Sequence, residues 1–184
     1  MSVGCATISA NQRILFYYRE TERLITYGDG NLLRADTDAL VNTVNCVGVM
    51  GKGIALQFKR RYPDMFTGYQ KACKNSEVVI GKMFVFETGQ LDGPKYVVNF
   101  PTKKHWRSPS QLSYIDAGLI DLISVIRDLG ITSIAIPALG AGNGGLDWRD
   151  VEPRLVKAFA DLPDVRAVLY APLEPDSVGI GGKP

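Results

Sequence analysis

The residues best suited to chemistry lie in a basic, aromatic run, residues 99–107, of this 184-residue chain. The run contains the pair Lys103 and Lys104, the only histidine of the chain, His105, and one of two tryptophans, Trp106. A partly desolvated lysine or histidine can transfer a proton or attack an electrophilic carbon, cations can meet phosphates, and an indole can stack on a base. The run predicts either a catalytic segment that also meets a nucleotide or a solvated charged turn anchored by Trp106.

Three glycines stand in a segment named here the first glycine loop, residues 46–53, between an apolar run and an amphipathic pattern. Glycine lets the backbone approach a phosphate, and a helix start offers unpaired N–H donors at the positive end of its dipole. The spacing Gly-x-x-Gly-Lys-Gly lacks the four-residue gap and the Ser/Thr of a Walker A loop. The segment therefore predicts an anion site of another kind, with an ordinary strand-to-helix turn as the alternative.

A second glycine loop, residues 140–148, follows the most β-like run of the chain and precedes another helical pattern. It fits GxGxxG, but that pattern alone is weak. Dinucleotide-binding folds carry an acid at the end of the next strand, and this chain has Tyr170 and Ala171 there. Two glycine loops at strand ends favour one diphosphate held from both sides.

Short apolar runs alternate with helical patterns along the chain. Strands are predicted at 24–27, 39–44, 83–87, 96–100, 133–139 and 167–170. Helices are predicted at 53–62, where Pro63 ends the pattern, at 114–129 and at 151–162. This alternation predicts an α/β fold with a mostly parallel or mixed sheet covered on both faces, and ligands at the carboxyl ends of the strands.

The charge balance restricts nucleic-acid binding to local patches. Lys and Arg total 21 against 19 Asp and Glu, a net charge of +2, which is too small for a general field that attracts polyanions. One basic cluster, residues 59–61 with Lys71 and Lys74, is interesting only if it lies beside the glycine loops. Otherwise it is a solvated face.

Cysteine usage and the N-terminus indicate a cytoplasmic protein. Cys5, Cys46 and Cys73 are odd in number and widely spaced, which argues against a disulfide framework and a zinc site. We expect neither a metal nor a cofactor. Residues 1–23 hold no continuous apolar stretch, which argues against a signal peptide and a membrane span, and no membrane partner is expected. We expect an N-terminal extension at 1–23, one domain at 24–171 and a Pro- and Gly-rich linker or tail at 172–184.

Four segments, at 30–33, 38–45, 51–53 and 137–142, together resemble the macrodomain family. The resemblance spans about residues 24–171 and implies a three-layer α/β/α fold with a mixed, mostly parallel central sheet. Within the family the run at 99–107 is most similar to the DarG group, the macrodomains of bacterial antitoxins.

The resemblance implies an enzyme, a glycosidase-type hydrolase that removes ADP-ribose from thymine bases of single-stranded DNA. Its partners would be ADP-ribose, the ADP-ribosylated strand, and a DarT-like ADP-ribosyltransferase toxin bound through a C-terminal domain outside these 184 residues. Two alternatives stay open. One is a macrodomain that binds ADP-ribose without chemistry, and the other is a deacylase of ADP-ribosylated protein carboxylates or O-acetyl-ADP-ribose.

The resemblance also implies roles for individual residues. Lys103 and Asn45 would be the catalytic residues, with Asn45 beside the distal ribose. Lys103 would stabilise the departing base electrostatically or, if neutral, form a Schiff base at C1″. Asn31 stands where macrodomains usually carry an adenine-binding Asp, and its uncharged carbonyl is a weaker acceptor. A related human enzyme has an acid where Gly144 stands, so a Lys–Asp pair is not implied.

The remaining expected contacts fall into two groups. His105, Trp106 and Arg107 are candidates for contact with DNA or the modified base. The expected ADP-ribose contacts, besides Asn31, are Leu32, Asn42, Gly48, Val49, Met50, Gly51, Lys52, Gly53, Gly140, Ala141, Gly142, Asn143, Gly144, Gly145 and Leu146.

Overall fold

The computed structural model describes residues 24–172, so the predicted extension at 1–23 and the predicted tail beyond Pro172 lie outside the described residues. The strands are β1 (Ile25–Tyr27), β2 (Ala39–Asn45), β3 (Phe84–Glu87), β4 (Tyr96–Lys103), β5 (Ser133–Pro137) and β6 (Arg166–Tyr170). The helices are η1 (Leu32–Arg34), α2 (Gly53–Arg61), α3 (Pro63–Lys74), α4 (Leu112–Asp128) and α5 (Trp148–Phe159).

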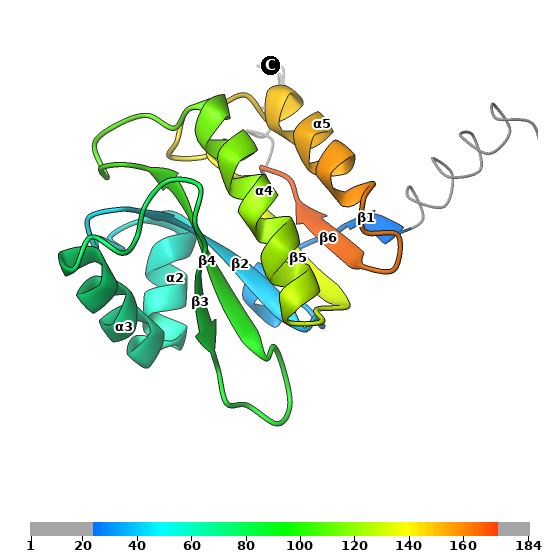
Figure 1. The fold of residues 1–184 in the computed structure, drawn as a ribbon, viewed down its shortest axis with the longest axis horizontal. Helices are drawn as coiled ribbons and strands as arrows, with labels where there is room; N and C mark the ends of the chain where they lie inside the picture. The colour runs from blue at the N-terminus through cyan, green and yellow to red at the C-terminus, as the bar shows by residue number, and fades with distance from the viewer. Residues whose placement is uncertain (1–23, 173–184) are drawn as a thin grey trace, which may run out of the picture.

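The strands form one sheet in the order β1-β6-β5-β2-β4-β3 (Figure 1). All neighbours are parallel except the edge strand β3, which pairs antiparallel with β4. The prediction of a mixed, mostly parallel sheet is confirmed. The five parallel strands end at the same edge of the sheet, which we call the site edge because both glycine loops leave from it.

Helices cover both faces of the sheet, so the three-layer arrangement is confirmed. Helices α4 and α5 pack on one face, and α2 and α3 pack on the other (Figure 1). Alternate residues of β2 serve the two cores: Val41 packs toward α4 and α5, whereas Leu40 and Val44 pack toward α2 and α3. Burial on both faces explains why the central strands are almost continuously apolar in sequence.

Two boundaries differ from the sequence prediction in ways that matter for the site. Strand β4 continues to Lys103 instead of ending at Phe100, because Pro101 and Lys103 still pair with Val44 and Asn45 of β2. The catalytic candidate Lys103 is therefore the last residue of a strand. Pro63 does end α2, but it also begins α3, a helix that the sequence analysis missed, because proline is well suited to the first helical position.

At the opposite edge of the sheet, Asp38 joins three strands. Its Oδ2 accepts from Thr132 N at 3.0 Å, Thr132 Oγ1 at 2.6 Å and Ser133 N at 3.1 Å, and Lys95 Nζ lies 3.4 Å from Oδ1. Partial burial raises the pKa of this carboxyl, but the hydrogen bonds and the Lys95 ammonium outweigh burial and lower the pKa to about 2. The ionised carboxylate thus holds the starts of β2, β4 and β5 together.

Candidate functional site

The two glycine loops converge at the site edge, because the strands that precede them, β2 and β5, are parallel neighbours. A Cβ added at Gly53 would lie 2.9 Å from Asn143 Nδ2, so the start of α2 and the second glycine loop are in contact. Strand β4 borders β2 on its other side and ends at Lys103. The structure therefore places both loops and Lys103 around one small region.

Free backbone donors line this region. The N–H groups of Gly51 and Lys52 in the first loop, and of Gly142 and Asn143 in the second, make no hydrogen bond to any residue in 24–172. No packing demand explains two of these glycines, since a Cβ at Gly142 would meet nothing within 4 Å and one at Gly51 only Val49 Cγ1 at 3.9 Å. Unpaired N–H groups beside a helix start form an anion site.

Asn45 shapes the first glycine loop from the end of β2. Its Oδ1 accepts from Val47 N at 3.0 Å and Val49 N at 3.3 Å, and its Nδ2 donates to Val49 O at 2.6 Å. The side chain is buried and the sheet register shifts between Val44 and Asn45. Asn45 thus acts on the loop conformation.

Helix α3 supports the same loop from the side. Tyr69 Oη donates to Asn45 O at 2.5 Å, and Gln70 Nε2 donates to Gly48 O at 3.2 Å. Gly48 adopts a φ of +78°, a conformation that glycine accepts without strain. The sequence analysis missed Tyr69 and Gln70 because it missed the helix that carries them.

Lys103 reaches across to the second loop. Its Nζ donates to the carbonyl oxygen of Asn143, and partial burial lowers the pKa of the amine. Within residues 24–172 no carboxylate forms an ion pair with Lys103. The lysine therefore has a peptide carbonyl as its partner, and desolvation favours its neutral form more than in water.

Ser110, which sequence reasoning also missed, packs under the second glycine loop. Its N–H donates to Gly144 O at 2.9 Å, and its buried hydroxyl has no hydrogen-bond partner. A Cβ at Gly144 would collide with Gly140 O and with Ser110 Oγ. The loop as folded has no space for an acidic side chain at position 144. This steric limit explains why glycine stands where the related human enzyme carries an acid.

The aromatic run lies beside the first glycine loop. Cys46 N donates to Lys103 O at 3.1 Å, and this contact joins the two segments. The rings of His105 and Trp106 stack with centroids 5.4 Å apart, and the Arg107 guanidinium carbon lies 4.4 Å from the Trp106 ring centroid. Trp106 stays 46% exposed, so the stack presents aromatic surface and positive charge to solvent.

The residues expected near adenine have different environments. Asn31 is exposed, and its side chain accepts from Leu33 N at 3.0 Å, capping η1. Leu32, Met50 and Asn42 are buried, and Asn42 donates to Asn99 Oδ1 at 2.9 Å. The structure buries these three side chains, with Leu32 and Met50 in the core on the α2 and α3 side of the sheet.

The other expected contact residues lie on the loops themselves. Gly140 and Gly145 have φ values of +68° and +80°, and Leu146 N donates to Gly140 O at 3.0 Å, which closes the second loop. Ala141 is half-buried within that loop, whereas Val49 of the first loop is 39% exposed. Of the sequence-predicted contacts, the structure thus brings those of both loops to the site edge.

Comparison with known proteins gave the following matches. The family model described as Macro domain matches residues 41–155. A DNA ADP-ribosyl glycohydrolase of Mycobacterium tuberculosis is 77% identical over 149 residues, which cover 81% of this chain and 42% of that protein. A protein of the same description from Thermus aquaticus is 52% identical over 151 residues, again covering 42% of its length. The chain therefore spans less than half of these curated relatives.

Solved structures match as well. The structure titled macrodomain of Mycobacterium tuberculosis DarG has a TM-score of 0.80 and 78% identity, and the match covers 80% of this chain and 97% of that one. Thermosipho africanus DarTG in complex with ADP-ribose has a TM-score of 0.78 and 32% identity, covering 83% of this chain and 43% of that one.

Proposed function

The chain belongs to the Macro domain family, and on that premise we propose that it is a DNA ADP-ribosyl glycohydrolase acting on ADP-ribosylated thymine in single-stranded DNA. The observation that carries the proposal is the environment of Lys103. Its amine is half-buried, has a lowered pKa and lies between the two glycine loops, and no carboxylate in residues 24–172 forms an ion pair with it. A module that only binds ADP-ribose needs the loops but not such a lysine.

The two glycine loops would bind the diphosphate of ADP-ribose. The free N–H groups of Gly51, Lys52, Gly142 and Asn143 offer donors from both sides, and the start of α2 adds the positive end of its dipole. Asn31 would meet the adenine end. Asn45, held by Tyr69, would keep the first loop in place near the distal ribose.

The reaction breaks the bond between ribose C1″ and thymine N3. The bond's electron pair leaves with the base as an imide anion, whose conjugate acid is about as acidic as a phenol, while positive charge develops on the ribose. Water adds to C1″, one of its protons is lost to solvent, and the base takes up a proton. Two routes fit Lys103. In the first, its ammonium stabilises the departing anion. In the second, its neutral amine attacks C1″ and displaces the base as the imide anion, the ribose ring opens as the proton of the amine passes to the ring oxygen, and water hydrolyses the resulting Schiff base to return the amine and free ADP-ribose.

The stacked run would meet the modified strand. His105, Trp106 and Arg107 follow the Lys103–Lys104 pair and carry ring surface and a cation into solvent. Bases stack on such surfaces in single strands. No base need be accommodated in the ester reactions of a deacylase, so an exposed stack beside the lysine favours DNA.

We also propose an antitoxin role in the cytoplasm, with a DarT-like transferase as partner through a C-terminal domain outside this chain. One relative, from Thermosipho africanus, is described as a DNA ADP-ribosyl transferase–DNA ADP-ribosyl glycohydrolase fusion protein and is 34% identical over 161 residues. Within residues 24–172 no helix is long and apolar enough to cross a membrane. The Macro unit would comprise residues 24–171.

The decisive experiment incubates the chain with a single-stranded oligonucleotide carrying ADP-ribosylated thymidine and measures free ADP-ribose. Release by wild type and its loss in Lys103→Ala are expected. Binding of ADP-ribose without release would show a binding module. Release only from protein carboxylates or O-acetyl-ADP-ribose would show a deacylase.

A further inference from the structure

The basic cluster predicted from sequence separates into two groups in the fold. Helix α2 begins at the site edge and runs away from it, so residues 59–61 lie at its far end. There Lys59 Nζ lies 4.1 Å from the Phe66 ring centroid, at the junction of the two helices. Helix α3 runs back, and Lys71 and Lys74 lie in its last turn.

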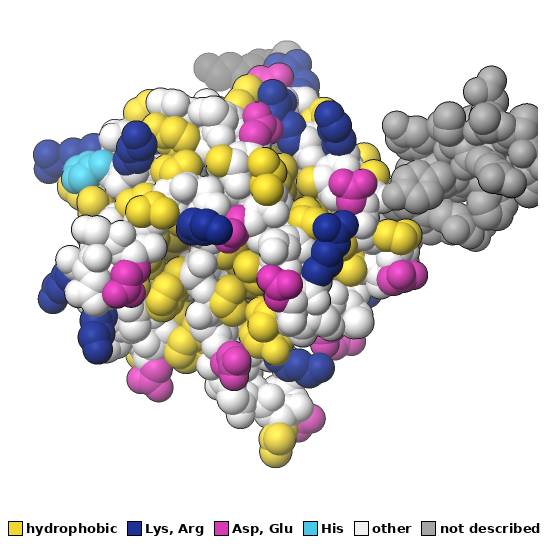
Figure 2. All heavy atoms as spheres, viewed as in Figure 1, with side chains coloured by type: hydrophobic (Ala, Val, Ile, Leu, Met, Phe, Trp, Pro, Cys, Tyr) yellow, Lys and Arg dark blue, Asp and Glu magenta, His cyan; other side chains and the backbone are white. Residues whose placement is uncertain are grey.

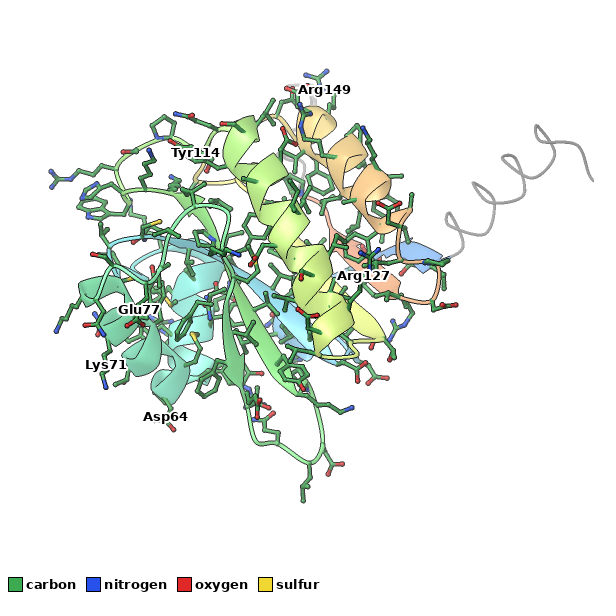
Figure 3. The ribbon with its side chains drawn as sticks, in the orientation of Figure 1. Asp64, Lys71, Glu77, Tyr114, Arg127 and Arg149 are labelled. Carbon is green, nitrogen blue, oxygen red and sulfur yellow. The ribbon has the colours of Figure 1, made fainter. Side chains whose placement is uncertain are left out.

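The end of α3 is in contact with the first glycine loop. Gln70 Nε2 donates to Gly48 O at 3.2 Å, and a Cβ on Gly48 would lie 3.7 Å from Gln70 Cα. Lys74 stands one helical turn after Gln70 on the same face of α3, and Lys71 follows Gln70 directly in sequence. Both lysines are exposed and form no ion pair with any residue in 24–172, and Figure 3 shows Lys71 projecting outward.

Val47 lies in the first glycine loop between a residue that contacts α3 and a residue that contacts the aromatic run. Its side chain is 45% exposed in the first glycine loop, between Gly48, which contacts α3, and Cys46, whose N–H also lies 3.3 Å from Lys104 O. Figure 2 shows Lys and Arg side chains beside the single histidine and again farther along the same border of the molecule. We call Val47, Lys71 and Lys74 the α3 strip. An acid, Glu77, follows α3, and its carboxylate accepts from Asn75 Nδ2.

We propose that the α3 strip is the track for the DNA strand that flanks the modified thymine, with a base against Val47 and backbone phosphates on Lys71 and Lys74. This inference rests on the proposed function. A DNA strand that extends from a modified base beside Lys103 meets both apolar surface and unpaired cations along the α3 strip. Proteins that bind single-stranded DNA combine these two features. The net charge of +2 supplies no general attraction, so these local cations matter.

The test compares two variants of equal charge, Lys71→Glu/Lys74→Glu and Arg60→Glu/Arg61→Glu. Each is assayed on ADP-ribosylated thymidine as the free nucleoside and within a single-stranded oligonucleotide of about ten nucleotides. The α3 variant should raise KM for the oligonucleotide about tenfold at low salt and flatten its salt dependence by roughly 0.7 in log–log slope per lost phosphate contact. Its kcat and its activity on the nucleoside should stay at wild-type values, as should every parameter of the α2 variant.

An unchanged KM of the α3 variant, or an equal increase in both variants, would overturn the track. Activity on the nucleoside and the thermal midpoint report whether each variant is folded. If wild type cleaves neither substrate, the proposed function fails. The track is then judged by the anisotropy of a labelled unmodified oligonucleotide, where weakening only in the α3 variant supports it and equal binding by all three proteins contradicts it.

Discussion

Lys103 combines three features that a solvated lysine lacks: it ends a buried strand, its pKa is lowered by burial, and its partner is the Asn143 carbonyl. A carbonyl accepts a hydrogen bond from either form of the amine and does not neutralise it. The same group can therefore act as a cation or as a nucleophile, and the two roles predict different responses to substitution and to pH.

Lys103→Ala should separate binding from chemistry. If the amine acts on the leaving base or at C1″, turnover on ADP-ribosylated thymidine DNA should fall roughly a hundredfold or more, while ADP-ribose affinity stays within a few-fold. Single-turnover assays and calorimetry measure the two quantities. Lys104→Ala is the matched control. If it lowers turnover as much as Lys103→Ala does, the assignment of the chemistry to Lys103 within this pair is wrong.

Lys103→Arg distinguishes the two roles of the amine. Arginine keeps the charge but forms no Schiff base at accessible pH, so substantial activity supports electrostatic stabilisation. The pH dependence of wild-type activity distinguishes the two roles independently, because they predict changes in opposite directions. A catalytic ammonium loses activity as pH rises through its lowered pKa, whereas a catalytic free amine gains activity over the same range.

Asn31→Asp should tighten ADP-ribose binding about two- to fivefold, because a charged acceptor makes the stronger hydrogen bond to an adenine amino group. Aspartate also caps a helix start as well as asparagine does, so the cap on Leu33 N should persist and the thermal midpoint should not change. Calorimetry measures the affinity. Equal or weaker binding would show that Asn31 does not face adenine, and Asp29 would be the next candidate.

At the scale of elements, the glycines of the second loop have two different functions. Gly142 is exposed and a Cβ there meets nothing within 4 Å, whereas a Cβ on Gly144 collides with Gly140 O and Ser110 Oγ. One glycine leaves its backbone open to a ligand, and the other allows the loop to pack.

Gly142→Val and Gly144→Ala should therefore have opposite profiles. Gly142→Val should cost about 0.5 kcal/mol of stability or less, as exposed substitutions do, yet abolish the rise in thermal midpoint that ADP-ribose produces in wild type. Gly144→Ala should lower stability by about 1–3 kcal/mol through overpacking. Thermal melts with and without millimolar ADP-ribose measure both. A ligand shift retained in Gly142→Val would remove this loop from the binding site.

At the scale of the whole molecule, Asp38 links acid stability to the closure of the sheet. Its folded pKa of about 2 lies below the usual 3.8, so the carboxylate stabilises the fold above pH 4 and this contribution disappears as pH falls from about 4 to 2. Asp38→Asn should lose roughly 1–2 kcal/mol at pH 7, allowing for a 22% exposed side chain, and almost nothing at pH 2. Denaturant melts across this pH range test it, and a difference independent of pH would contradict it.

Much of the fold could be predicted because its signals are local. Apolar runs such as 39–44 and 133–139 predict buried strands by residue type, and the helical repeat at 114–129 predicts α4 by spacing alone. Glycines between a strand and a helix predict loops that approach an anion, and the parallel topology then brings the two loops to one edge.

Only the tertiary structure decided which residues support the site, because such support comes from contacts between segments far apart in sequence. Tyr69 and Gln70 hold the first loop from a helix that begins at a proline, and Ser110 occupies the space beside Gly144. The direction of α2 and α3 decided that Lys71 and Lys74 lie at the helix end that contacts the first glycine loop, while residues 59–61 lie at the far end of α2. Periodicity determines which face of a helix is buried, but the packing of two helices on a sheet determines which end of each reaches the site.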